Sequence, residues 1–242
     1  MSLLSTIKKV KHQEDFFPGF LGLFINPFWL ARRGLVSQIK ELAGYLSGDL
    51  LDVGCGRKPY RELFKVKSYL GLDIENPGHS HENEDVDVFY DGHTFPFAQN
   101  SFDSVLCNQV LEHVFNPDEF LSEIHRCLKP GGQFLLTVPF VWDEHEQPFD
   151  YARYSSFGLK HLLEKNGFVI IEQRKSIQNI AVVFQLFIAY VYKITKTPWF
   201  VSNVVLTTVL MMPLTLLGLI LGWLLPKNRD LYLDNLILAR KS

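Results

Sequence analysis

The sequence predicts an α/β fold, a doubly wound and mostly parallel sheet of seven strands with a hydrophobic helical insertion between strands six and seven. After Gly48, short apolar runs alternate with helical stretches, which is the pattern of parallel β-α units. A last apolar run follows the turn-rich sequence at 226–229. Residues 176–228, which extend into this turn, are mostly apolar and do not fit the alternation. They are therefore interpreted as an insertion.

The elements follow from the spacing of apolar residues. A helix is predicted over 28–46, because Leu35, Ile39, Leu42 and Leu46 recur at helical spacing before Ser47-Gly48. Gly167 is expected to end the last helix of the domain as a left-handed stop. The predicted strands are 50–54, 69–74, 86–90, 104–108, 133–138, 168–173 and 231–239, the last antiparallel. The predicted helices between them are 59–65, 117–128 and 155–166.

The chain is expected to have three parts: a helical cap over 1–47, a domain formed by 48–175 with 229–242, and the insertion over 176–228. The apolar run at 16–31 follows basic residues as in a signal peptide. However, Glu14, Asp15 and Pro18 interrupt that pattern, and no small-residue cleavage site follows. The segment is either a cap that packs on the domain or a segment at a membrane interface.

Composition excludes several classes of protein. The chain has 47% hydrophobic and 21% charged residues, enough apolar material for a large core. Its 24 basic and 26 acidic residues give a charge of −2, which argues against a nucleic-acid partner. The cysteines are odd in number and lack zinc-site spacing, so reduced thiols are expected. The 14% aromatic content, enriched near the N-terminus and over 177–225, indicates a membrane.

The first strand ends in a glycine-rich turn that is typical of a cofactor site. Gly54 and Gly56 lie at the carboxyl edge of the predicted sheet, where open α/β sheets bind ligands. A dinucleotide fingerprint needs a third glycine three residues later, where this sequence has Pro59. Asp73 ends the next strand, at the position from which a carboxylate can accept hydrogen bonds from ribose hydroxyls.

Several motifs occur in the order found in one family. The chain resembles the class I S-adenosylmethionine-dependent methyltransferases of the type 11 branch over about residues 28–175. The motifs are Asp52-Val-Gly-Cys-Gly56, Gly71-Leu-Asp-Ile74, Asp91 followed by Phe95-Pro-Phe97, Asn100-Ser-Phe-Asp103, Leu111-Glu-His113 and Leu128-Lys-Pro-Gly-Gly132. Residues 57–60, Arg-Lys-Pro-Tyr, are more basic than the small residues usual in the family.

The resemblance implies S-adenosylmethionine as the cofactor and assigns residues to its parts. Asp52 and the Gly54-Cys55-Gly56 backbone are expected to approach the methionine part. Asp73, with Ile74 beside it, is expected to hold the ribose. The expected adenine contacts are Asp91 and Gly92, and the expected amino-acid contact is Asn108.

A hydroxyl acceptor requires a base as well as alignment and a dry pocket. The loop over 141–154 follows the fifth strand and supplies His145, the predicted base. His113 either reaches the transferred methyl group or caps a turn. Alternatively, this loop is solvated and Asp150 pairs with Arg153 to fix a turn. A metal site from His145, Glu146 and Asp150 is possible by ligand type, but nothing in the sequence fixes its geometry, so no metal is expected.

The predicted function is methyl transfer from S-adenosylmethionine to a membrane-associated acceptor. A lipid-linked or cell-envelope glycan is the first expectation for this acceptor, and a quinone or other lipid headgroup the second. One alternative is a metal-dependent glycosyltransferase built around Asp85 and Asp87, which have the Asp-x-Asp form. The other is a non-catalytic membrane adaptor that keeps the fold.

Charge spacing in the insertion predicts how it meets a membrane. Thirty uncharged residues lie between Lys196 and Lys227, and 17 lie between Lys175 and Lys193. Because strands six and seven belong to one sheet, the insertion must cross a bilayer an even number of times. Pro213 favours a kinked helix or re-entrant hairpin, and hence monotopic insertion into the cytoplasmic leaflet, over two spans. The remaining alternative is a soluble core or dimer interface.

Overall fold

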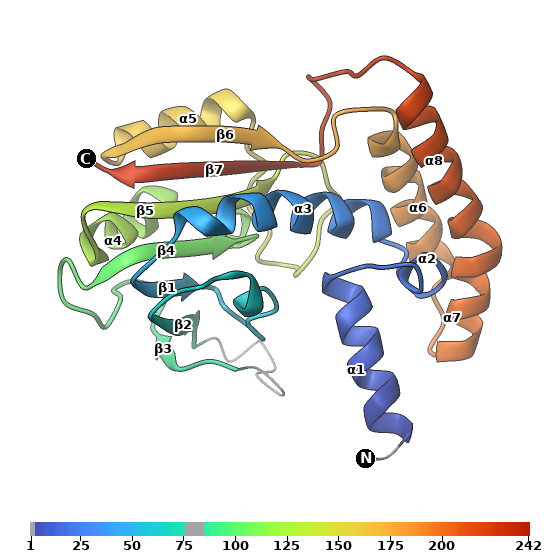
Figure 1. Ribbon diagram of the computed structural model, residues 1–242, viewed down its shortest axis with the longest axis horizontal. Coiled ribbons are helices and arrows are strands. Elements are labelled where there is room, and N and C mark those ends of the chain that lie inside the picture. Colours follow the sequence, from blue (N-terminus) through green and yellow to red (C-terminus); the bar gives the residue numbers. More distant parts are fainter. Residues whose placement is uncertain (1–2, 76–84) are drawn as a thin grey trace. The chain divides into compact units, whose positions relative to one another are not determined.

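The computed structural model describes residues 3–75 and 85–242, and Figure 1 shows its course. The chain forms two compact units. The helical unit consists of Met1–Gln38 and Lys175–Leu233, and the sheet unit consists of Ile39–Arg174 and Asp234–Ser242. Each unit is described separately below.

The sheet has seven strands in the order β3-β2-β1-β4-β5-β7-β6. β1 pairs in parallel with β2 and with β4, and β7 runs antiparallel to β5. The prediction of a doubly wound sheet with an antiparallel last strand and an apolar helical insertion before it is confirmed. The strands are β1 (Asp49–Val53), β2 (Ser68–Ile74), β3 (Val88–Tyr90), β4 (Phe102–Asn108), β5 (Leu128–Pro139), β6 (Phe168–Lys175) and β7 (Asp234–Lys241).

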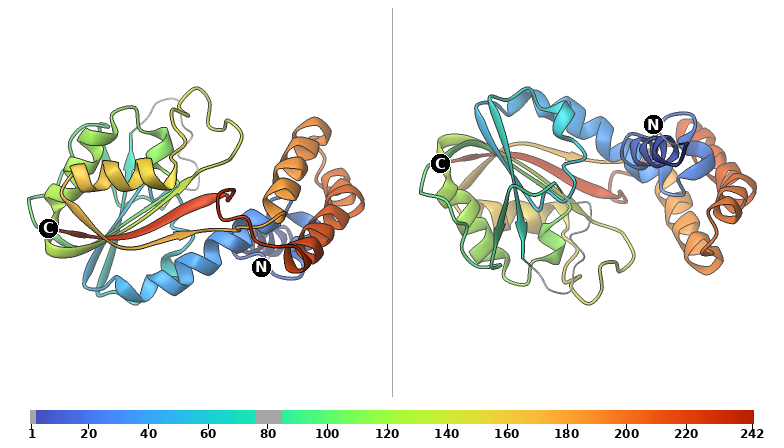
Figure 2. Two further views of the ribbon diagram at one scale, coloured as in Figure 1. Left: turned by 90° about the horizontal axis from the view of Figure 1, so that it is seen from above. Right: turned by 90° about the horizontal axis from the view of Figure 1, so that it is seen from below.

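Helices cover both faces of this sheet (Figure 2). α4 (Pro117–Cys127) and α5 (Ser156–Lys165) lie on one face. The end of α3 (Trp29–Leu42), which continues into the 3₁₀ turn η1 (Ala43–Tyr45), lies on the other. α4 begins with a proline and two acidic residues, which suit a helix N-terminus, and the hydroxyl of Ser155 caps α5 by accepting from Gly158 N at 3.2 Å. Local sequence therefore sets where these helices start.

One predicted helix, over 59–65, is wrong. The described chain has there only the 3₁₀ turn η2 (Arg61–Leu63). Lys58 adopts a left-handed φ of +48°, and the hydrogen bonds that follow join residues three apart, such as Arg61 N to Lys58 O. The backbone becomes extended at Phe64, with φ −100° and ψ 115°, so the turn ends there before an α-helical ladder forms. A similar 3₁₀ turn, η3 (Leu111–His113), follows β4.

The largest differences from the predicted strand boundaries are at the starts of β7 and β5. β7 begins at Asp234 rather than Leu231, because Leu233 N donates a hydrogen bond to Ser176 O within the helical unit. β5 begins five residues earlier than expected, at Leu128, where the family-like Lys-Pro-Gly-Gly sequence is part of the strand. Gly131 has a φ of +75° in this stretch.

The helical unit contains two long apolar helices of the insertion. α6 (Ala181–Thr195) is followed by α7 (Phe200–Leu206), a π-helical turn (Thr207–Met211) and α8 (Met212–Leu224). Residues Phe200–Leu224 form one continuous helix with a mean hydropathy of 2.4. By length and composition it is the one described helix that could cross a membrane. The π-helical turn ends just before Pro213, which lacks an N–H for the regular helical ladder.

The N-terminal segment packs against the insertion within this unit. It forms α1 (Leu3–Phe16), α2 (Gly22–Ile25) and the start of α3. The buried amide of Gln185 joins α6 to the start of α3, because Oε1 accepts from Ala31 N at 3.1 Å and Nε2 donates to Pro27 O at 3.1 Å. A small apolar core formed by Leu30, Ala181, Ile188 and Met211 completes the packing.

The two helical segments of the insertion run antiparallel. Near the start of α6, the amide of Asn179 donates to the carbonyl of Gly222 at 3.2 Å. One turn further on, a Cβ at Gly218 would lie 3.0 Å from Phe184. The glycines of α8 therefore let it approach α6 closely, and the insertion is a helical hairpin.

Candidate active site

The turn that follows β1 contains two glycines in the left-handed region, Gly54 with φ +70° and Gly56 with φ +47°. Their surroundings differ. A Cβ at Gly54 would lie 2.3 Å from a methyl carbon of Val110, whereas a Cβ at Gly56 would have no other atom within 4 Å. Gly54 is therefore required by packing, and the backbone at Gly56 borders open space that a ligand can approach.

Asp73 connects this turn to the end of β2. Its Oδ2 accepts a hydrogen bond from Gly56 N at 2.8 Å, and its Oδ1 accepts one from Ile74 N at 2.8 Å. The glycine turn and the acidic residue, which the sequence suggested as two parts of one site, are thus in direct contact. Cys55 lies between the glycines, and its buried thiol has a pKa raised by burial.

Asp52 is less accessible than the family resemblance implies. It is 4% exposed, and its Oδ2 accepts a hydrogen bond from the hydroxyl of Tyr69 at 2.6 Å. Burial raises the pKa of Asp52 to about 7, although the hydrogen bond from Tyr69 opposes that shift. The carboxyl group is engaged inside the domain, and contact with the methionine part of a cofactor stays a prediction.

Lys58, one of the two unusual basic residues after the glycine turn, has a structural role. It is 4% exposed, and its Nζ donates to Oδ2 of Asp87 at 2.7 Å. The same oxygen accepts from Gly71 N at 2.6 Å, and Asp85 lies 3.6 Å from Nζ. Lys58 is thus a buried cation that ties the glycine turn to the start of β3. Asp87 is held by this cation, and the alternative of an Asp-x-Asp metal site loses support.

The remaining predicted cofactor residues lie after strands β2, β3 and β4. Asp91 follows β3, where its carboxylate accepts hydrogen bonds from His93 N and Thr94 N, which lower its pKa. Gly92 has a φ of +87°, and a Cβ there would lie 3.0 Å from the side chain of Ile74. Asn108 ends β4, and its Oδ1 accepts from the hydroxyl of Thr137. These residues occupy the carboxyl edge of the sheet, as predicted for a ligand site.

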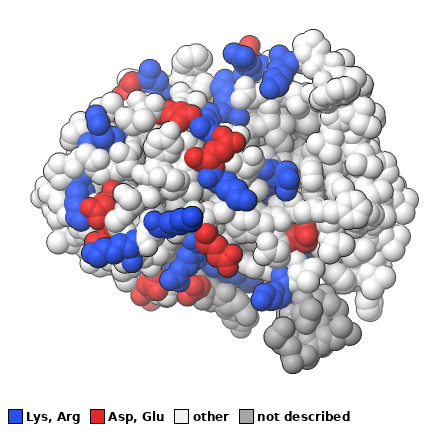
Figure 3. All heavy atoms as spheres, in the orientation of Figure 1, with Lys and Arg blue, Asp and Glu red and all other residues white. Residues whose placement is uncertain are grey.

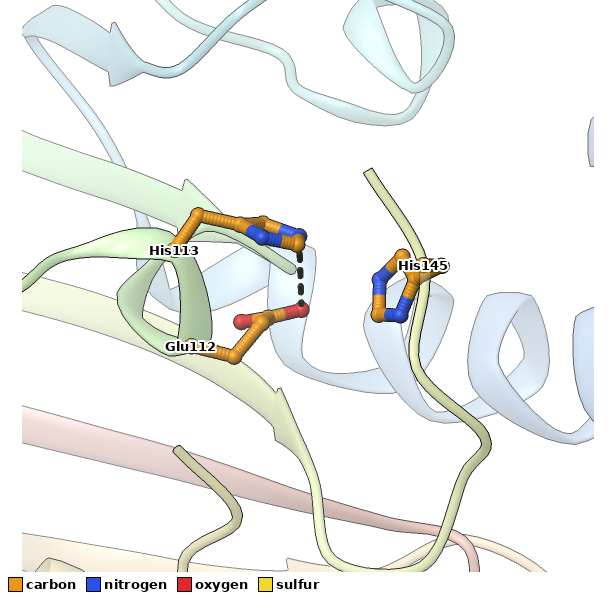
Figure 4. A group of neighbouring side chains, drawn as sticks. All are labelled: Glu112, His113 and His145. Atoms are coloured by element: carbon orange, nitrogen blue, oxygen red, sulfur yellow. Dashed lines mark ion pairs between the residues drawn. The ribbon is translucent and has the colours of Figure 1, made fainter. Parts of the chain in front are cut away.

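A second group of side chains lies at the same edge, after β4 and β5. Figure 4 shows Glu112 and His113 of η3 facing His145 from the loop after β5. One ligand-type atom from each residue lies within 4.8 Å of the others. The rings of His113 and His145 meet edge to face, with centroids 4.7 Å apart. The structure therefore brings together the two histidines that the sequence proposed separately.

The loop that holds His145 is fixed by the ion pair that the sequence offered as an alternative. Asp150 accepts hydrogen bonds from two nitrogens of Arg153, at 2.5 and 2.6 Å, and from His145 N at 2.9 Å. Burial opposes ionisation of Asp150, but these hydrogen bonds outweigh it and lower its pKa to about 2. Burial lowers the pKa of His145, which favours the neutral form of its imidazole.

Glu112 is the site residue that sequence reasoning did not single out. It is fully buried, and burial raises its pKa to about 8. The backbone carbonyl of Glu112 accepts from Tyr151 N at 2.8 Å, which joins η3 to the histidine loop. The residue belongs to the family-like Leu-Glu-His motif, and a carboxylate next to His113 was the signal available in the sequence.

The family model described as "Methyltransferase domain" matches residues 51–136. This stretch runs from β1 to β5 and includes the glycine turn, Asp73 and Glu112-His113. The chain contains a methyltransferase domain. The expected membership of the S-adenosylmethionine-dependent methyltransferases is confirmed at the level of this domain.

A curated relative agrees with this assignment. A Mycolicibacterium smegmatis protein described as a "probable S-adenosylmethionine-dependent methyltransferase" is 30% identical over 162 residues, which cover 62% of this chain and 62% of that protein. The chain thus spans less than two thirds of that curated relative.

Two solved structures share the fold. Phosphoethanolamine N-methyltransferase 2 of Haemonchus contortus, in complex with S-adenosyl-L-methionine, superposes with a TM-score of 0.53 at 20% identity, over 95% of this chain and 59% of that one. The [4+2]-cyclase SpnF superposes with a TM-score of 0.52 at 20% identity, over 88% of this chain and 83% of that one. Because one of them is a cyclase, the fold alone does not fix the reaction.

Proposed function

We propose that this chain is an S-adenosylmethionine-dependent methyltransferase whose acceptor is held at a membrane. The observation that carries the proposal is the combination of a methyltransferase domain with a helical hairpin whose outward face is apolar. A lipid-linked or cell-envelope glycan is the acceptor class that we propose first, and a quinone or other lipid headgroup the second.

The residues of the sheet unit fit the cofactor. The backbone at Gly56 borders open space, and the carboxylate of Asp73 lies beside it at the end of β2. We assign Gly54–Gly56 and Asn108 to the methionine part, Asp73 and Ile74 to the ribose, and Asp91 and Gly92 to the adenine. When bound, S-adenosylmethionine supplies an electrophilic methyl group.

The chain's own residues must then orient the acceptor and accept or polarise its proton. His145 and His113 lie together after β5 and β4, and the ion pair of Asp150 with Arg153 holds the loop in place. A neutral imidazole such as that of His145 has a lone pair for an acceptor proton or for a cation. His145 is therefore the residue that we place on the acceptor side of the site, with His113 beside it.

The membrane part of the proposal is supported by the outer face of α6. Val183, Phe187, Tyr190 and Ile194 recur at intervals of three and four residues, and between 46% and 65% of each is exposed. Trp199 and Trp223 of the hairpin are exposed as well. On the face shown in Figure 3, α8 presents no Lys, Arg, Asp or Glu. A continuous apolar patch of this kind is typical of surfaces that bind lipid or another protein.

The lengths of the helices favour insertion into one leaflet. Phe200–Leu224 is about 37 Å long at 1.5 Å per residue, whereas the 15 residues of α6 reach only about 22 Å, short of the roughly 30 Å of a bilayer core. β6 and β7 are neighbours in one sheet, so the connection between them returns to the side from which it left. We propose a monotopic anchor on the cytoplasmic side, with two spans as the alternative.

Labelled S-adenosylmethionine tests this function. The protein is incubated with the labelled cofactor and a membrane lipid extract, and the lipid fractions are then separated. Label in a lipid fraction is the expected result, and label confined to water-soluble acceptors would overturn the membrane acceptor. Calorimetry with S-adenosylmethionine in the presence of a chelator tests the rivals, because absence of cofactor binding would favour the adaptor or the glycosyltransferase.

A cysteine placed at Thr195 tests the topology. Thr195 ends α6 at the distal turn of the hairpin, and the three native cysteines are buried. In intact cells, an impermeant thiol reagent is expected to leave Thr195→Cys unlabelled. Labelling from outside would contradict the monotopic anchor and favour two spans.

A further inference from the structure

The cluster of Glu112, His113 and His145 has an unusual member. Glu112 is 0% exposed, and neither of its carboxylate oxygens has a hydrogen-bond partner among the described residues. Arg153 is the cation of the histidine loop, and its two terminal nitrogens already donate hydrogen bonds to both oxygens of Asp150. Burying a polar atom without a hydrogen-bond partner costs free energy, so buried polar atoms are usually paired. The two oxygens of Glu112 therefore lack a partner that the site itself supplies.

Hydrogen bonds to backbone carbonyls orient both histidines of the cluster. Nδ1 of His113 lies 2.9 Å from the carbonyl oxygen of Phe149, and Nδ1 of His145 lies 3.2 Å from that of Asp143. A carbonyl only accepts, so Nδ1 of His113 carries the proton and its Nε2 keeps a lone pair. Nδ1 of His145 lies close to a second acceptor, Oδ2 of Asp150 at 3.3 Å, and to one donor, a guanidinium nitrogen of Arg153 at 3.4 Å. The two nearer acceptors favour a proton on Nδ1 there as well, which leaves the lone pair on Nε2. Histidines that ligate metals are commonly oriented in this way, by a backbone carbonyl at the opposite nitrogen.

We propose that Glu112, His113 and His145 bind a divalent transition-metal cation. Nε2 of His113 lies 3.9 Å from Oε1 of Glu112, so a cation placed slightly off the line between them can lie about 2.0–2.2 Å from both atoms. The ligand atom of His145 lies within 4.8 Å of these two atoms, and a small shift of its ring brings it into bonding range. Two imidazoles and one carboxylate are a donor set typical of Mn²⁺, Fe²⁺ or Zn²⁺ with positions left open. The cation would give the buried oxygens of Glu112 the partner that they lack.

The neighbouring carboxylates have different roles in this site. Glu146 is half exposed and lies 3.8 Å from Nε2 of His113, within reach of an open coordination position. Asp150, which the sequence suggested as a ligand together with His145 and Glu146, is instead held by Arg153. The ligand set assigned by the structure thus differs from the sequence-based combination by including Glu112 and His113.

A role for the cation in the reaction rests on the proposed function, whereas its binding does not. The cluster lies beside the glycine turn, because Val110, two residues before Glu112, packs against Gly54. An open position on the cation can hold an acceptor oxygen and make it more acidic. In that case His145 acts on the acceptor through the cation, and the proton of the acidified acceptor is released to solvent water before the oxygen attacks the methyl group.

Metal titration without the cofactor tests the site. The full chain is stripped with a chelator, dialysed, and titrated with Mn²⁺ by electron paramagnetic resonance and with Zn²⁺ by calorimetry. One saturable site per chain is expected. Glu112→Gln and His145→Ala should each weaken binding at least about tenfold. His161→Ala is the matched control, because this histidine is exposed on α5 and should leave the affinity unchanged.

Each outcome is decisive for the site. Absence of saturable binding to the wild-type chain overturns the proposal, and so does binding that neither substitution in the cluster weakens. Circular dichroism tests whether each variant is folded; Glu112→Gln is nearly isosteric, so it should fold. Calorimetry with S-adenosylmethionine in chelator is run on the same samples. Cofactor binding without metal binding would disprove the metal site alone.

Discussion

Gly54 and Gly56 have similar backbone conformations but different consequences for substitution. Any side chain at Gly54 meets Val110, so that position belongs to the packing between β1 and the turn after β4. At Gly56 the cost to the fold is only that of a left-handed backbone, about 1–2 kcal/mol for a residue with a Cβ. Stability and cofactor binding can therefore be separated at these two positions.

We expect Gly56→Ala to weaken S-adenosylmethionine binding at least about tenfold in a protein that stays folded, because its methyl group enters the space left for the ligand. Thermal unfolding should occur a few degrees lower. Gly54→Ala should lower stability much more, through its contact with Val110. Calorimetry and thermal melts measure both effects. Unchanged affinity of folded Gly56→Ala would contradict the assignment of the cofactor to this turn.

The raised pKa of Asp52 predicts that the free energy of unfolding depends on pH. Its pKa is about 7 in the folded chain against 3.8 for the free side chain. Between about pH 4 and pH 7, the carboxyl group is therefore protonated in the folded state and ionised in the unfolded state. The stability from this group is present below about pH 4 and disappears as pH rises to about 7. Carboxyl groups with lowered pKa values, such as Asp150, act in the opposite direction.

Asp52→Asn isolates this contribution, because an asparagine can still accept the hydrogen bond from Tyr69. The stability of the variant relative to wild type should rise by about 2 kcal/mol from pH 5 to pH 8, since one pKa unit corresponds to 1.36 kcal/mol. Urea unfolding without cofactor measures it. All other carboxyl groups cancel in the difference, so a difference that is constant over this range would show that Asp52 has no raised pKa.

For single residues, the sequence predicted the place in the fold better than the burial and the partners of the side chain. It placed Gly56 and Asp73 in one site because both lie at the carboxyl ends of neighbouring parallel strands. The order of strands and helices along the chain is enough to predict that position. It did not predict that Lys58 is buried against Asp87, or that Glu112 is buried without a partner. Burial of a charged residue depends on side chains from distant segments, which no local pattern encodes.

The loop after β5 is an element whose order depends on one ion pair. Asp150 receives hydrogen bonds from Arg153 and from His145 N, and its side chain is almost fully buried. Removing its charge leaves the guanidinium of Arg153 without its partner, and hydrogen bonds to charged groups contribute about 1.5–3 kcal/mol each. The position of His145 depends on the same contacts.

We therefore expect Asp150→Asn to destabilise the domain by about 1.5–3 kcal/mol and to lower methyl transfer, with little change in S-adenosylmethionine affinity. Urea unfolding, turnover and calorimetry measure the three effects. Asp118→Asn is the control, because Asp118 forms an exposed pair with Lys165 and should have a smaller effect. Equal losses of stability in both variants would show that the loop does not depend on the buried pair.

At the scale of elements, strong local signals gave accurate helices. α4 and α5 start where proline, acidic residues and a serine cap indicate, and Gly167 ends α5 with a φ of +83°. The predicted helix over 59–65 failed because the chain forms only a 3₁₀ turn there and becomes extended at Phe64, directly after the buried contact of Lys58 with Asp87. Tertiary structure overrode the local pattern there.

For the whole molecule, the sequence predicted an apolar insertion but not that the N-terminal segment packs against it. Residues 1–38 fold together with the insertion, through the buried amide of Gln185 and the core around Leu30 and Ile188. The sequence left the N-terminal segment either as a cap on the domain or as a membrane segment. Segments about 150 residues apart meet here, a contact that periodicity within either segment does not reveal.

The exposed face of α6 gives the test of the anchor. Phe187 is 50% exposed and Ile194 is 65% exposed, so the double variant Phe187→Glu, Ile194→Glu adds two charges without disturbing the core of the helical unit. A charge at the boundary between headgroups and acyl chains is costly, so binding to vesicles should fall at least about tenfold. The control is Phe157→Glu, since Phe157 is 84% exposed on α5 of the sheet unit and should leave binding unchanged. Flotation with vesicles of phosphatidylethanolamine and phosphatidylglycerol measures the bound fraction, and thermal melts confirm folding. A wild-type protein that stays at the bottom of the gradient, or equal loss in the α5 control, would contradict the assignment of the apolar face of α6 as a lipid anchor.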